Sequence, residues 1–525
     1  MSTPNSIPEA FAIAAERSPN KLMVHYEGTD LTYQQLRERV LRAAGILAGW
    51  GLRRGDRVAI HLQNSPRFIE AYLAVLTVGG VAVPINTRYQ RMEIEHVITD
   101  SGACLVITDA SSDDDPAAAV TIASGSLPIL FLPSGTDAAD THWQSMGVAG
   151  SLSAAVEIGA DELAVIGYTS GTTGRSRGAM LSHGNFLANS HAVANAWGWS
   201  QDDHLLLALP LFHTHGLAVG LHGTIIRGTS MTLLPRFDGD VVFDHLMSGS
   251  PTMFFGVPTM YTRLGDVAQR RLTTPSNLRL LVSGSAPLSP ATFQAVEASF
   301  GQRILERYGM TETVMNLGNP LVGERRIGSV GVPFSGVSVR IADPISDVEV
   351  EPGATGEIQV RGPNVFAGYW RNASDTERAF ATDSWFKTGD LGFVDEDGYY
   401  FIVGRAKELV ITGGFNVHPR EVEEVIEEIP TIREVAVLGL PDDDLGEKVV
   451  AAIVPHDAAP SWEAILEHCS ERIASFKKPR DLYVLDALPR NALGKVQKHL
   501  LRTTLLAMAP LQRPCACPAQ GTGDT

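Results

Sequence analysis

The chain has 525 residues, of which 44 % are hydrophobic and 19 % charged, and its formal net charge is −17. This composition excludes a disordered chain, which lacks the apolar surface to offset the entropy of ordering, and a small scaffold that depends on disulfides. The negative charge argues against a nucleic-acid partner, because such binders gain most of their affinity by neutralising phosphates with Lys and Arg.

The first half of the chain alternates short β-branched runs with longer helical patterns. A helix is predicted near the N-terminus, where Ile7, Phe11, Ile13 and Ala14 lie on or near one helical face. Strands are predicted over residues 57–62, 81–86, 104–109, 230–235, 252–258 and 278–284, and helices over residues 65–80 and 88–102. Strands that alternate with helices favour an α/β fold with helices covering parallel sheets. Residues 112–160, rich in Ser, Ala, Asp and Gly, are expected to form a surface connection.

The pattern changes in the last third of the chain. Alternating apolar and polar residues with turn signals over 328–370 predict a small antiparallel β unit. From about residue 408, strands and helices alternate over roughly 100 residues, an ordinary domain size. We therefore predict a large N-terminal domain over residues 1–404, built from βαβ subdomains and the β unit. A small mobile α+β domain over 405–510 and a disordered tail over 511–525 are expected to follow.

The cysteines and the hydropathy of the chain indicate in which cellular compartment the protein is expected. Cys104, Cys469, Cys515 and Cys517 show neither zinc-ligand spacing nor a disulfide framework, so we expect reduced thiols and a cytoplasmic protein. No stretch approaches the roughly 20 apolar residues of a transmembrane helix, and the N-terminus lacks the basic region of a signal peptide. We therefore expect no transmembrane segment. Whether the chain is a monomer or a homodimer stays open.

The most distinctive motif runs from Tyr168 to Gly178, with the sequence YTSGTTGRSRG. Small and hydroxylated residues in a row form no core, but their backbone N–H groups and hydroxyls can converge on phosphate oxygens. Arg177 adds a cation for charge-assisted contacts. A flexible linker has no reason to follow an apolar strand and precede a helix signal, so we interpret the motif as a phosphate-binding loop. It is not a Walker A loop, because no Gly-Lys-Ser/Thr ends it.

This loop resembles the signature loop of the adenylate-forming superfamily, which includes acyl-CoA synthetases, nonribosomal peptide adenylation domains and beetle luciferases. The usual pattern carries Pro-Lys before the last Gly, where this chain has Ser176 and Arg177. Further motifs of the superfamily follow in its order, and the resemblance spans residues 8–507. They are Gly284-Ser285-Ala286-Pro287, Tyr308-Gly309-Met310-Thr311-Glu312, Thr388-Gly389-Asp390, Gly404-Arg405-Ala406-Lys407, Gly413-Gly414-Phe415-Asn416 and the run from Pro489 to Lys495.

The resemblance implies a role for each motif. Lys495, Thr311, Glu312 and His213 are the expected catalytic residues, with Glu312 helping to hold Mg²⁺. Carboxylate oxygens beside phosphates suit that hard cation. The expected ATP and AMP contacts come from Thr169, Ser170, Gly171, Thr172, Thr173, Gly174, Arg177, Gly284, Ser285, Ala286, Glu306, Arg307, Tyr308, Gly309, Met310, Asp390 and Arg405. Lys407 is the expected hinge, and Gly413, Gly414 and Phe415 are expected to face CoA.

The resemblance further implies a ligase with ATP and CoA as substrates. A carboxylate and Mg-ATP would give an acyl-adenylate and diphosphate, with Lys495 stabilising charge in the transition state. The small domain would then rotate about Lys407, and the CoA thiolate would displace AMP. Two alternatives remain: a protein that makes only the acyl-adenylate, and a relative that only binds.

The acid itself is less sharply indicated. The expected acyl pocket contains His215, Arg236, Phe255, Gly256 and Arg279, and the motifs resemble those of malonyl-CoA synthetases most. A short dicarboxylate would need a cation at its far carboxylate, since an unpaired buried charge is costly, and the two arginines are the candidates. The phenylalanines would equally suit an apolar tunnel for a fatty acid. A small (di)carboxylic acid such as malonate is the favoured substrate, with a medium- or long-chain fatty acid as the alternative.

Overall fold

The computed structural model describes residues 4–109, 127–132, 152, 155–169, 176–275, 277–413, 415–442, 444–470, 472–491 and 494–511. The chain divides into two compact units. The first unit comprises Met1–Thr388 with Phe393–Phe401, and the second comprises Gly389–Gly392 with Ile402–Thr525. Most of the predicted connection over 112–160 and nearly all of the predicted tail lie outside the described residues.

The first unit contains a six-stranded sheet with the strand order β6-β5-β3-β4-β7-β8. Neighbouring strands are parallel except for the antiparallel pair β7 and β8. The helix α4 packs on it through Ile94 and Val97, which meet Val83 and Val106. The prediction of parallel strands with crossover helices is confirmed here. The elements are β3 Arg57–His61, α3 Pro66–Thr77, β4 Val81–Pro84, α4 Arg91–Ser101, β5 Leu105–Asp109, β6 Ile129–Leu132, β7 Leu163–Thr169 and β8 Arg177–Ser182.

A second, thirteen-stranded sheet has the order β16-β17-β18-β19-β15-β14-β13-β12-β11-β9-β10-β1-β2. Neighbouring strands from β13 to β1 in this order are parallel. The pairs β13–β14, β14–β15, β15–β19 and β16–β17 are antiparallel. The predicted β unit after residue 328 therefore extends a parallel sheet. The strands are β1 Leu22–Tyr26, β2 Thr29–Thr32, β9 His204–Leu207, β10 Ser230–Leu233, β11 Met253–Gly256, β12 Leu280–Ser283, β13 Leu305–Tyr308, β14 Leu317–Gly318, β15 Ser329–Pro333, β16 Ser338–Ala342, β17 Gly356–Arg361, β18 Phe386–Val394 and β19 Tyr400–Arg405.

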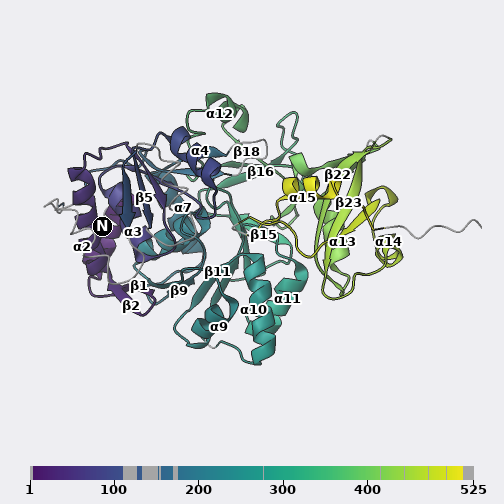
Figure 1. The fold of residues 1–525 in the computed structure, drawn as a ribbon, viewed down its shortest axis with the longest axis horizontal. Coiled ribbons are helices and arrows are strands. Elements are labelled where there is room, and N and C mark those ends of the chain that lie inside the picture. Colours follow the sequence, from purple (N-terminus) through teal and green to yellow (C-terminus); the bar gives the residue numbers. More distant parts are fainter. Residues whose placement is uncertain are drawn as a thin grey trace, which may run out of the picture. The chain divides into compact units, whose positions relative to one another are not determined.

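Helices cover this sheet on both faces. Side chains alternate between the faces of a strand, so Phe254 packs with Tyr261 and Phe293 on one face, while Phe255 meets Trp197 on the other. Figure 1 shows α10 and α11 side by side next to β11. The remaining helices of the unit are α1 Ile7–Arg17, α2 Tyr33–Gly49, α7 His183–Ala196, the π-helix η1 His215–Leu221, α8 His222–Arg227, α9 Gly239–Met247, α10 Pro258–Arg271, α11 Pro290–Phe300 and α12 Ala373–Ala379.

Local chemistry sets several of these helix starts. Ser6, Ser65 and Ser289 each accept a hydrogen bond from a backbone N–H of the first turn; Pro directly follows Ser65 and Ser289, and Pro8 is the second residue of α1. A side-chain acceptor satisfies a donor that the helix leaves free, and Pro at the first position has no N–H to satisfy. The helix predicted near the N-terminus therefore begins as expected.

The second unit has its own sheet, in the order β21-β20-β23-β22, with β24 paired to β23. Alternation again separates two cores: Val437 and Val449 face α13 and α14, whereas Leu438 and Val450 face Leu501 of α15. This agrees with the predicted α+β segment. The elements are the 3₁₀ turn η2 Ala406–Glu408, β20 Val410–Thr412, β21 Phe415–Val417, α13 Pro419–Glu427, β22 Ile432–Asp442, β23 Gly446–Pro455, α14 Trp462–Ser470, η3 Ser475–Lys477, β24 Asp481–Val484 and α15 Lys498–Leu506.

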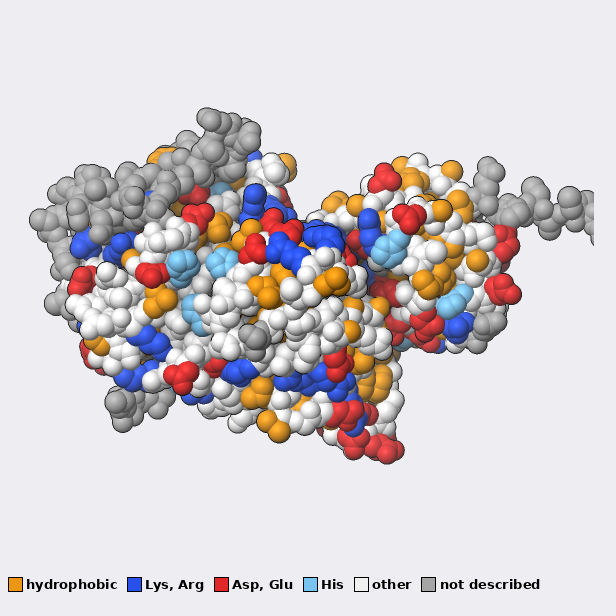
Figure 2. All heavy atoms as spheres, turned by 90° about the horizontal axis from the view of Figure 1, so that it is seen from below, with side chains coloured by type: hydrophobic (Ala, Val, Ile, Leu, Met, Phe, Trp, Pro, Cys, Tyr) orange, Lys and Arg blue, Asp and Glu red, His pale blue; other side chains and the backbone are white. Residues whose placement is uncertain are grey.

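Two surface properties follow. Within the described ranges no helix has the length and apolar character that would let it cross a membrane. On the face of the first unit in Figure 2, Lys and Arg side chains lie among Asp and Glu side chains. The charges on that face are mixed, so it does not offer the single basic field that nucleic acid needs.

Candidate active site

Several predicted segments meet at one edge of the thirteen-stranded sheet. β9, β11, β12 and β13 are parallel, so their carboxyl ends share that edge. The segment with His213 and His215 follows β9, Gly256 ends β11, Gly284 follows β12 and Tyr308 ends β13. In open α/β sheets, ligands bind outside the carboxyl ends of the strands. The fold therefore assembles the predicted acyl and adenine motifs at one place.

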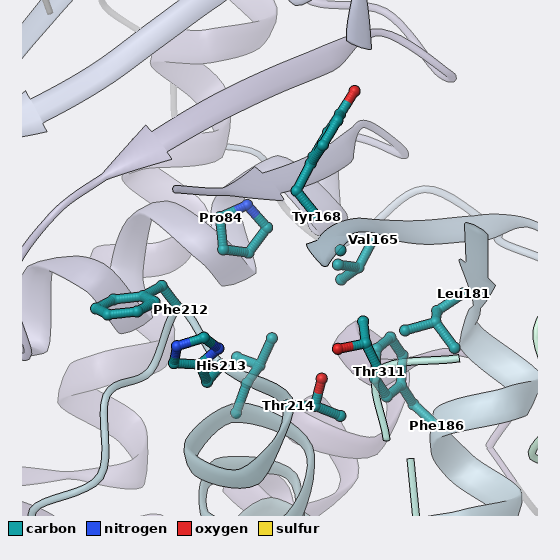
Figure 3. Close-up of a pocket in the computed structure, with 11 residues that line it drawn as sticks. Pro84, Val165, Tyr168, Leu181, Phe186, Phe212, His213, Thr214 and Thr311 are labelled. Atoms are coloured by element: carbon teal, nitrogen blue, oxygen red, sulfur yellow. The ribbon is translucent and has the colours of Figure 1, made fainter. Parts of the chain in front are cut away.

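A pocket of the first unit lies between β7 and the segment after β9 (Figure 3). Its lining includes His213, Thr214 and Thr311, and Figure 3 shows the two threonine hydroxyls pointing toward the same space. At Gly167 a Cβ would lie 2.8 Å from the Thr311 methyl group, so glycine in β7 makes room for Thr311. Enclosure by the pocket lowers the pKa of His213 to about 4, and its imidazole is therefore neutral at neutral pH.

His215, Ser285 and Arg307 form a buried polar cluster beside this pocket. The Ser285 Oγ lies 3.4 Å from His215 Nδ1 and accepts a hydrogen bond of 3.3 Å from Arg307 Nη2. The backbone of Ser285 has φ of +71°, in a region that non-glycine residues rarely adopt. A strained backbone conformation of this kind persists only where the surrounding structure holds it in place, and it is often found at functional sites. Burial, and next the charge of Arg307, hold the pKa of His215 well below its usual value.

Arg307 is the most deeply buried cation of this cluster. Its predicted contact with the nucleotide stays a prediction, and its guanidinium packs against Gly284, where a Cβ would lie 2.5 Å from the Arg307 Cζ. The side chain is 2 % exposed, and among the described residues no carboxylate forms an ion pair with it and its Nε has no partner. Burial lowers its pKa to about 9, which leaves it charged at neutral pH. The only signal in the sequence was a Glu-Arg pair inside a short apolar strand.

The predicted arginine of the far-carboxylate subsite, Arg279, lies elsewhere. It immediately precedes β12, at the amino edge of the sheet, and its guanidinium pairs with Asp203 at 2.5 Å. Arg279 also donates to the carbonyls of Trp197 and Gly198. The ion pair with Asp203 at the amino edge of the sheet argues against the prediction that Arg279 binds the far carboxylate of the acid. Arg236 is exposed after the carboxyl end of β10, at the expected edge.

Phe255 and Gly256, two residues predicted for the acyl pocket, end β11 at the carboxyl edge of the sheet, and their role stays a prediction. Phe255 is fully buried, and its ring stacks on Trp199 at 5.6 Å and on His215 at 6.5 Å between centroids. At Gly256 a Cβ would lie 3.0 Å from the Phe254 ring and 3.2 Å from that of Tyr261. Aromatic rings therefore close the space behind His215.

The Tyr308–Val314 segment forms a tight turn. A Cβ at Gly309 would lie 1.9 Å from the Val314 carbonyl oxygen, so only glycine fits there. Val314 has φ of +56° and is fully buried, which is rare for a β-branched residue. This turn places Thr311 in the pocket and buries Glu312, which is 4 % exposed and accepts a hydrogen bond of 3.0 Å from the Tyr369 hydroxyl.

The remaining nucleotide candidates of the first unit divide into two groups. Thr169, the last residue of β7, pairs with Arg177, the first residue of β8, and α7 follows directly after β8. The insertion of β8 before the helix was not predicted. Ser170, Gly171, Thr172, Thr173 and Gly174 lie outside the described residues, as does Gly414 of the glycine loop. Ala286 and Met310 are partly buried, and Glu306 and Tyr308 are buried in β13.

The second unit brings together three of its predicted residues. Arg405 Nε lies 2.9 Å from Asp390 Oδ1, and both charges act on Lys495. Burial lowers the pKa of Lys495 most, and the charge of Arg405 lowers it further. The charges of Asp390 and Glu408 act in the opposite direction and raise this pKa. Lys407 is exposed in η2, and Gly413 and Phe415 are exposed in the β20–β21 hairpin. Their expected roles as hinge and CoA contacts stay predictions.

The residues of the first unit fit a magnesium–nucleotide complex. Glu312 and Thr311 supply hard oxygen donors at adjacent positions. Nowhere in the described ranges do three or more His, Cys, Asp or Glu side chains form a metal-binding group. Mg²⁺ is commonly held by one or two carboxylates together with substrate phosphates, so one carboxylate at this place suits that cation.

Comparisons with known proteins agree with this arrangement. A family model of AMP-binding enzymes matches residues 11–370, and a model of the C-terminal domain of such enzymes matches residues 421–495. ATP-bound MatB from Rhodopseudomonas palustris has a similar structure, with a TM-score of 0.88 and 41 % identity over 95 % of this chain and 99 % of that chain. A feruloyl-CoA synthase from Amycolatopsis sp is 37 % identical over 93 % of this chain and 96 % of its own. A malonate–CoA ligase from Arabidopsis thaliana is 34 % identical over 95 % of this chain and 89 % of its own.

Proposed function

The chain belongs to the family of AMP-binding enzymes, and we propose that it is an acid–CoA ligase that acts on a short dicarboxylic acid such as malonate. In the first half-reaction the carboxylate attacks the α-phosphate of ATP, giving an acyl-adenylate and diphosphate. In the second, the CoA thiolate attacks the acyl carbon, and AMP leaves with the electron pair of the broken C–O bond. The products are the acyl-CoA, AMP and diphosphate.

One observation supports the choice of a dicarboxylate: the buried Arg307 guanidinium forms no ion pair with a described carboxylate, and of the acidic groups only the charge of the neighbouring Glu306 is seen to act on it. An uncompensated buried charge costs several kcal/mol, whereas a bidentate carboxylate would satisfy its planar donors. Ser285 and His215 add a hydroxyl and an imidazole beside it. A substrate with a second carboxylate would supply the missing anion, which neither an alkyl chain nor an aromatic acid without one can do.

The reacting end of the acid is assigned to the neighbouring pocket. Thr311 and the neutral imidazole of His213 lie there together, and each can hydrogen-bond a carboxylate or phosphate oxygen. Lys495 of the second unit would contribute the cation that stabilises charge developing on the α-phosphate. Magnesium, when bound with ATP, would neutralise phosphate charge beside Glu312.

The first experiment measures AMP release from the purified chain with ATP and Mg²⁺, with and without CoA, over malonate, succinate, propionate, octanoate and ferulate. We expect AMP and a thioester with malonate, and little with propionate because it lacks the second carboxylate. Release of AMP with octanoate or ferulate but not malonate would overturn the dicarboxylate assignment. Acyl-adenylate without thioester would instead indicate an adenylation-only enzyme, and no AMP with any acid would overturn the ligase.

The variant Arg307→Gln tests directly whether the buried Arg307 binds the second carboxylate of the acid. We expect kcat/KM for malonate to fall on the order of 100-fold, because a buried carboxylate loses its charged partner, while the low activity with propionate changes little. Arg325→Gln is the matched control: Arg325 is 9 % exposed and, among the residues that the structure describes, donates to backbone carbonyls alone, those of Pro320, Arg303 and Leu321. Equal losses with malonate and propionate in Arg307→Gln would mean that Arg307 serves the nucleotide or the fold.

A further inference from the structure

Three segments that are far apart in the sequence meet around the ring of Tyr369. Its hydroxyl donates to Glu312 Oε1 at 3.0 Å, and the Arg177 guanidinium lies over its ring, 4.2 Å from the centroid. Tyr369 is 5 % exposed and Glu312 is 4 % exposed. The hydrogen bond is therefore shielded from water and acts on a carboxylate that is assigned to the nucleotide.

The backbone around Tyr369 is fixed from two sides. The Trp370 N–H donates to the Gly178 carbonyl at 2.8 Å, and Ala179 forms a bridge with Tyr369, which ties this segment to β8. The Phe366 N–H donates to the Glu312 carbonyl at 2.8 Å, and the Tyr369 N–H donates to Thr376 Oγ1 at 2.9 Å. These backbone hydrogen bonds hold the segment in place, so the ring of Tyr369 has little freedom to move away from Glu312.

Arg177 is suited to this ring in a way that a lysine is not. Its Nη1 lies 3.2 Å from Asp375 Oδ2 while the guanidinium plane covers the tyrosine. A planar, delocalised cation can stack and form an ion pair at the same time, whereas an ammonium group is a point charge that does one or the other. Arg177 stands where the superfamily pattern usually has Lys. The packing of Arg177 on Tyr369 and its ion pair with Asp375 give a physical reason for an arginine at this position in place of the usual lysine.

We propose that Tyr369 is a positioning residue that fixes the Glu312 carboxylate for the magnesium–ATP complex, and that Arg177 acts through Tyr369 by holding its ring in place. The inference rests on the proposed use of Mg-ATP. Partners that orient a metal-binding carboxylate commonly change metal affinity by 10- to 100-fold when they are removed. Tyr369 and Arg177 therefore belong to the nucleotide site without having to touch the substrate.

Tyr369→Phe removes the hydroxyl and keeps the ring under Arg177. Titration calorimetry with ATP, once in Mg²⁺ and once in EDTA, separates the metal-dependent part of binding. We expect the variant to bind ATP about tenfold more weakly in Mg²⁺ and as wild type does in EDTA. KM for malonate should stay unchanged, because the acyl cluster is not altered. An equal loss in both buffers, or no loss, would overturn the proposal.

Tyr399→Phe is a closely matched control. Tyr399 also lies under an arginine, with Arg326 Cζ 4.2 Å from its ring centroid, and its hydroxyl donates to the Glu324 carbonyl at 2.8 Å. The acceptor there is a backbone carbonyl and no nucleotide group is assigned to it. We expect this variant to bind ATP as wild type in both buffers. A loss specific to Mg²⁺ in the control would overturn the inference for Tyr369.

Arg177→Lys tests the second half of the proposal. Lysine keeps the charge but loses the stacked plane, so we expect a weaker effect in the same direction as Tyr369→Phe, again confined to Mg²⁺. A loss in EDTA would show that Arg177 contacts phosphate itself and would overturn its action through Tyr369. Since binding is measured without an acid, failure of the proposed ligase reaction would appear separately, as wild-type protein that binds Mg-ATP but releases no AMP.

Discussion

Lys495 lies among charges of both signs in the second unit, and its environment makes its protonation state a testable quantity. Burial and Arg405 lower its pKa from the ordinary 10.5. In the proposed reaction the charged amine would stabilise the adenylation transition state, and this form disappears as the pH rises through that lowered value. The first half-reaction should therefore weaken at a lower pH than an ordinary lysine would dictate.

We predict that Lys495→Ala reduces malonate-dependent ATP–diphosphate exchange by 10²- to 10³-fold, roughly the cost of removing one charge-stabilising donor. The basic decline in the wild-type pH–rate profile should be absent from the residual activity. Thioester formation from supplied malonyl-adenylate should persist, since that step does not use the amine. Parallel loss of both half-reactions would contradict the assigned role.

At the scale of elements, one buried side chain holds two loops at the carboxyl edge of the large sheet. Asn64 Nδ2 donates to the carbonyls of Leu209 and Leu234, and its Oδ1 accepts from the Leu211 N–H. It therefore ties the segment after β9, which carries His213, to the segment after β10. Asn64 is 5 % exposed, so its partners would be left unsatisfied in a dry environment if it were removed.

We predict that Asn64→Ala lowers the free energy of unfolding by about 3 kcal/mol, measured by urea denaturation, and raises KM for malonate. Asn277→Ala is the control, because Asn277 is exposed and its side chain donates a hydrogen bond to the Gly249 carbonyl at the surface. Unchanged stability in Asn64→Ala would show that these loops hold their places by other contacts.

Two neighbouring phenylalanines of β11, Phe254 and Phe255, face opposite sides of one sheet. Substituting each in turn tests which side of the sheet limits the size of the acid that binds. Phe255 stacks behind His215, whereas Phe254 packs with Tyr261 under α10. Both are fully buried. We predict that Phe255→Leu reduces selectivity for malonate over succinate roughly tenfold, the usual weight of one methylene group in a pocket. Competition assays would measure it.

Phe254→Leu should lose comparable stability and keep the selectivity of the wild type. If both variants change selectivity equally, the effect comes from general loosening of the sheet, and Phe255 would not set the size of the acid.

For the whole molecule, the two compact units place the assigned groups on separate bodies. Glu312, Arg307 and His213 belong to the first, and Lys495 belongs to the second, with Lys407 exposed in η2 near the start of that unit. A reaction in two steps with a different set of groups in each step would require the second unit to change its orientation, with a few residues absorbing the change in φ and ψ.

We predict that Lys407→Pro leaves diphosphate exchange within a few-fold of wild type and reduces thioester formation on the order of 100-fold, because proline fixes φ at the expected hinge. Rapid-quench measurement of each half-reaction checks this. Lys407→Ala, which retains backbone freedom, should support both steps. If the proline variant lost diphosphate exchange but kept thioester formation, Lys407 would not be the hinge.

The net charge of −17 argues against a nucleic-acid partner but does not explain how the proposed anionic ligands would be attracted. Charges on the face in Figure 2 are mixed. In the proposed reaction, local cations at the assigned sites, Arg307 and Lys495 among them, would attract the substrates, since exposed charges beyond about 10 Å are largely screened at physiological salt.

The sequence by itself determined the α/β architecture and the order of the motifs. Alternation and helical periodicity reflect locally which face of an element is buried, so β3 and β11 begin and end close to their predicted positions. The signature loop identified the family for the same reason, because contiguous residues carry it. Whether the domain boundary lies at residue 404 stays a prediction, as do the roles of the hinge and the glycine loop.

Only the tertiary structure decided which charges are compensated. Arg279 and Arg307 look alike in the sequence, but Asp203, 76 residues before Arg279, pairs with the first, and no described carboxylate forms an ion pair with the second. Tyr369 and Glu312 lie 57 residues apart and carried no signal of their contact. The free energy of a buried charge depends on partners brought together by folding, and local periodicity carries no record of them.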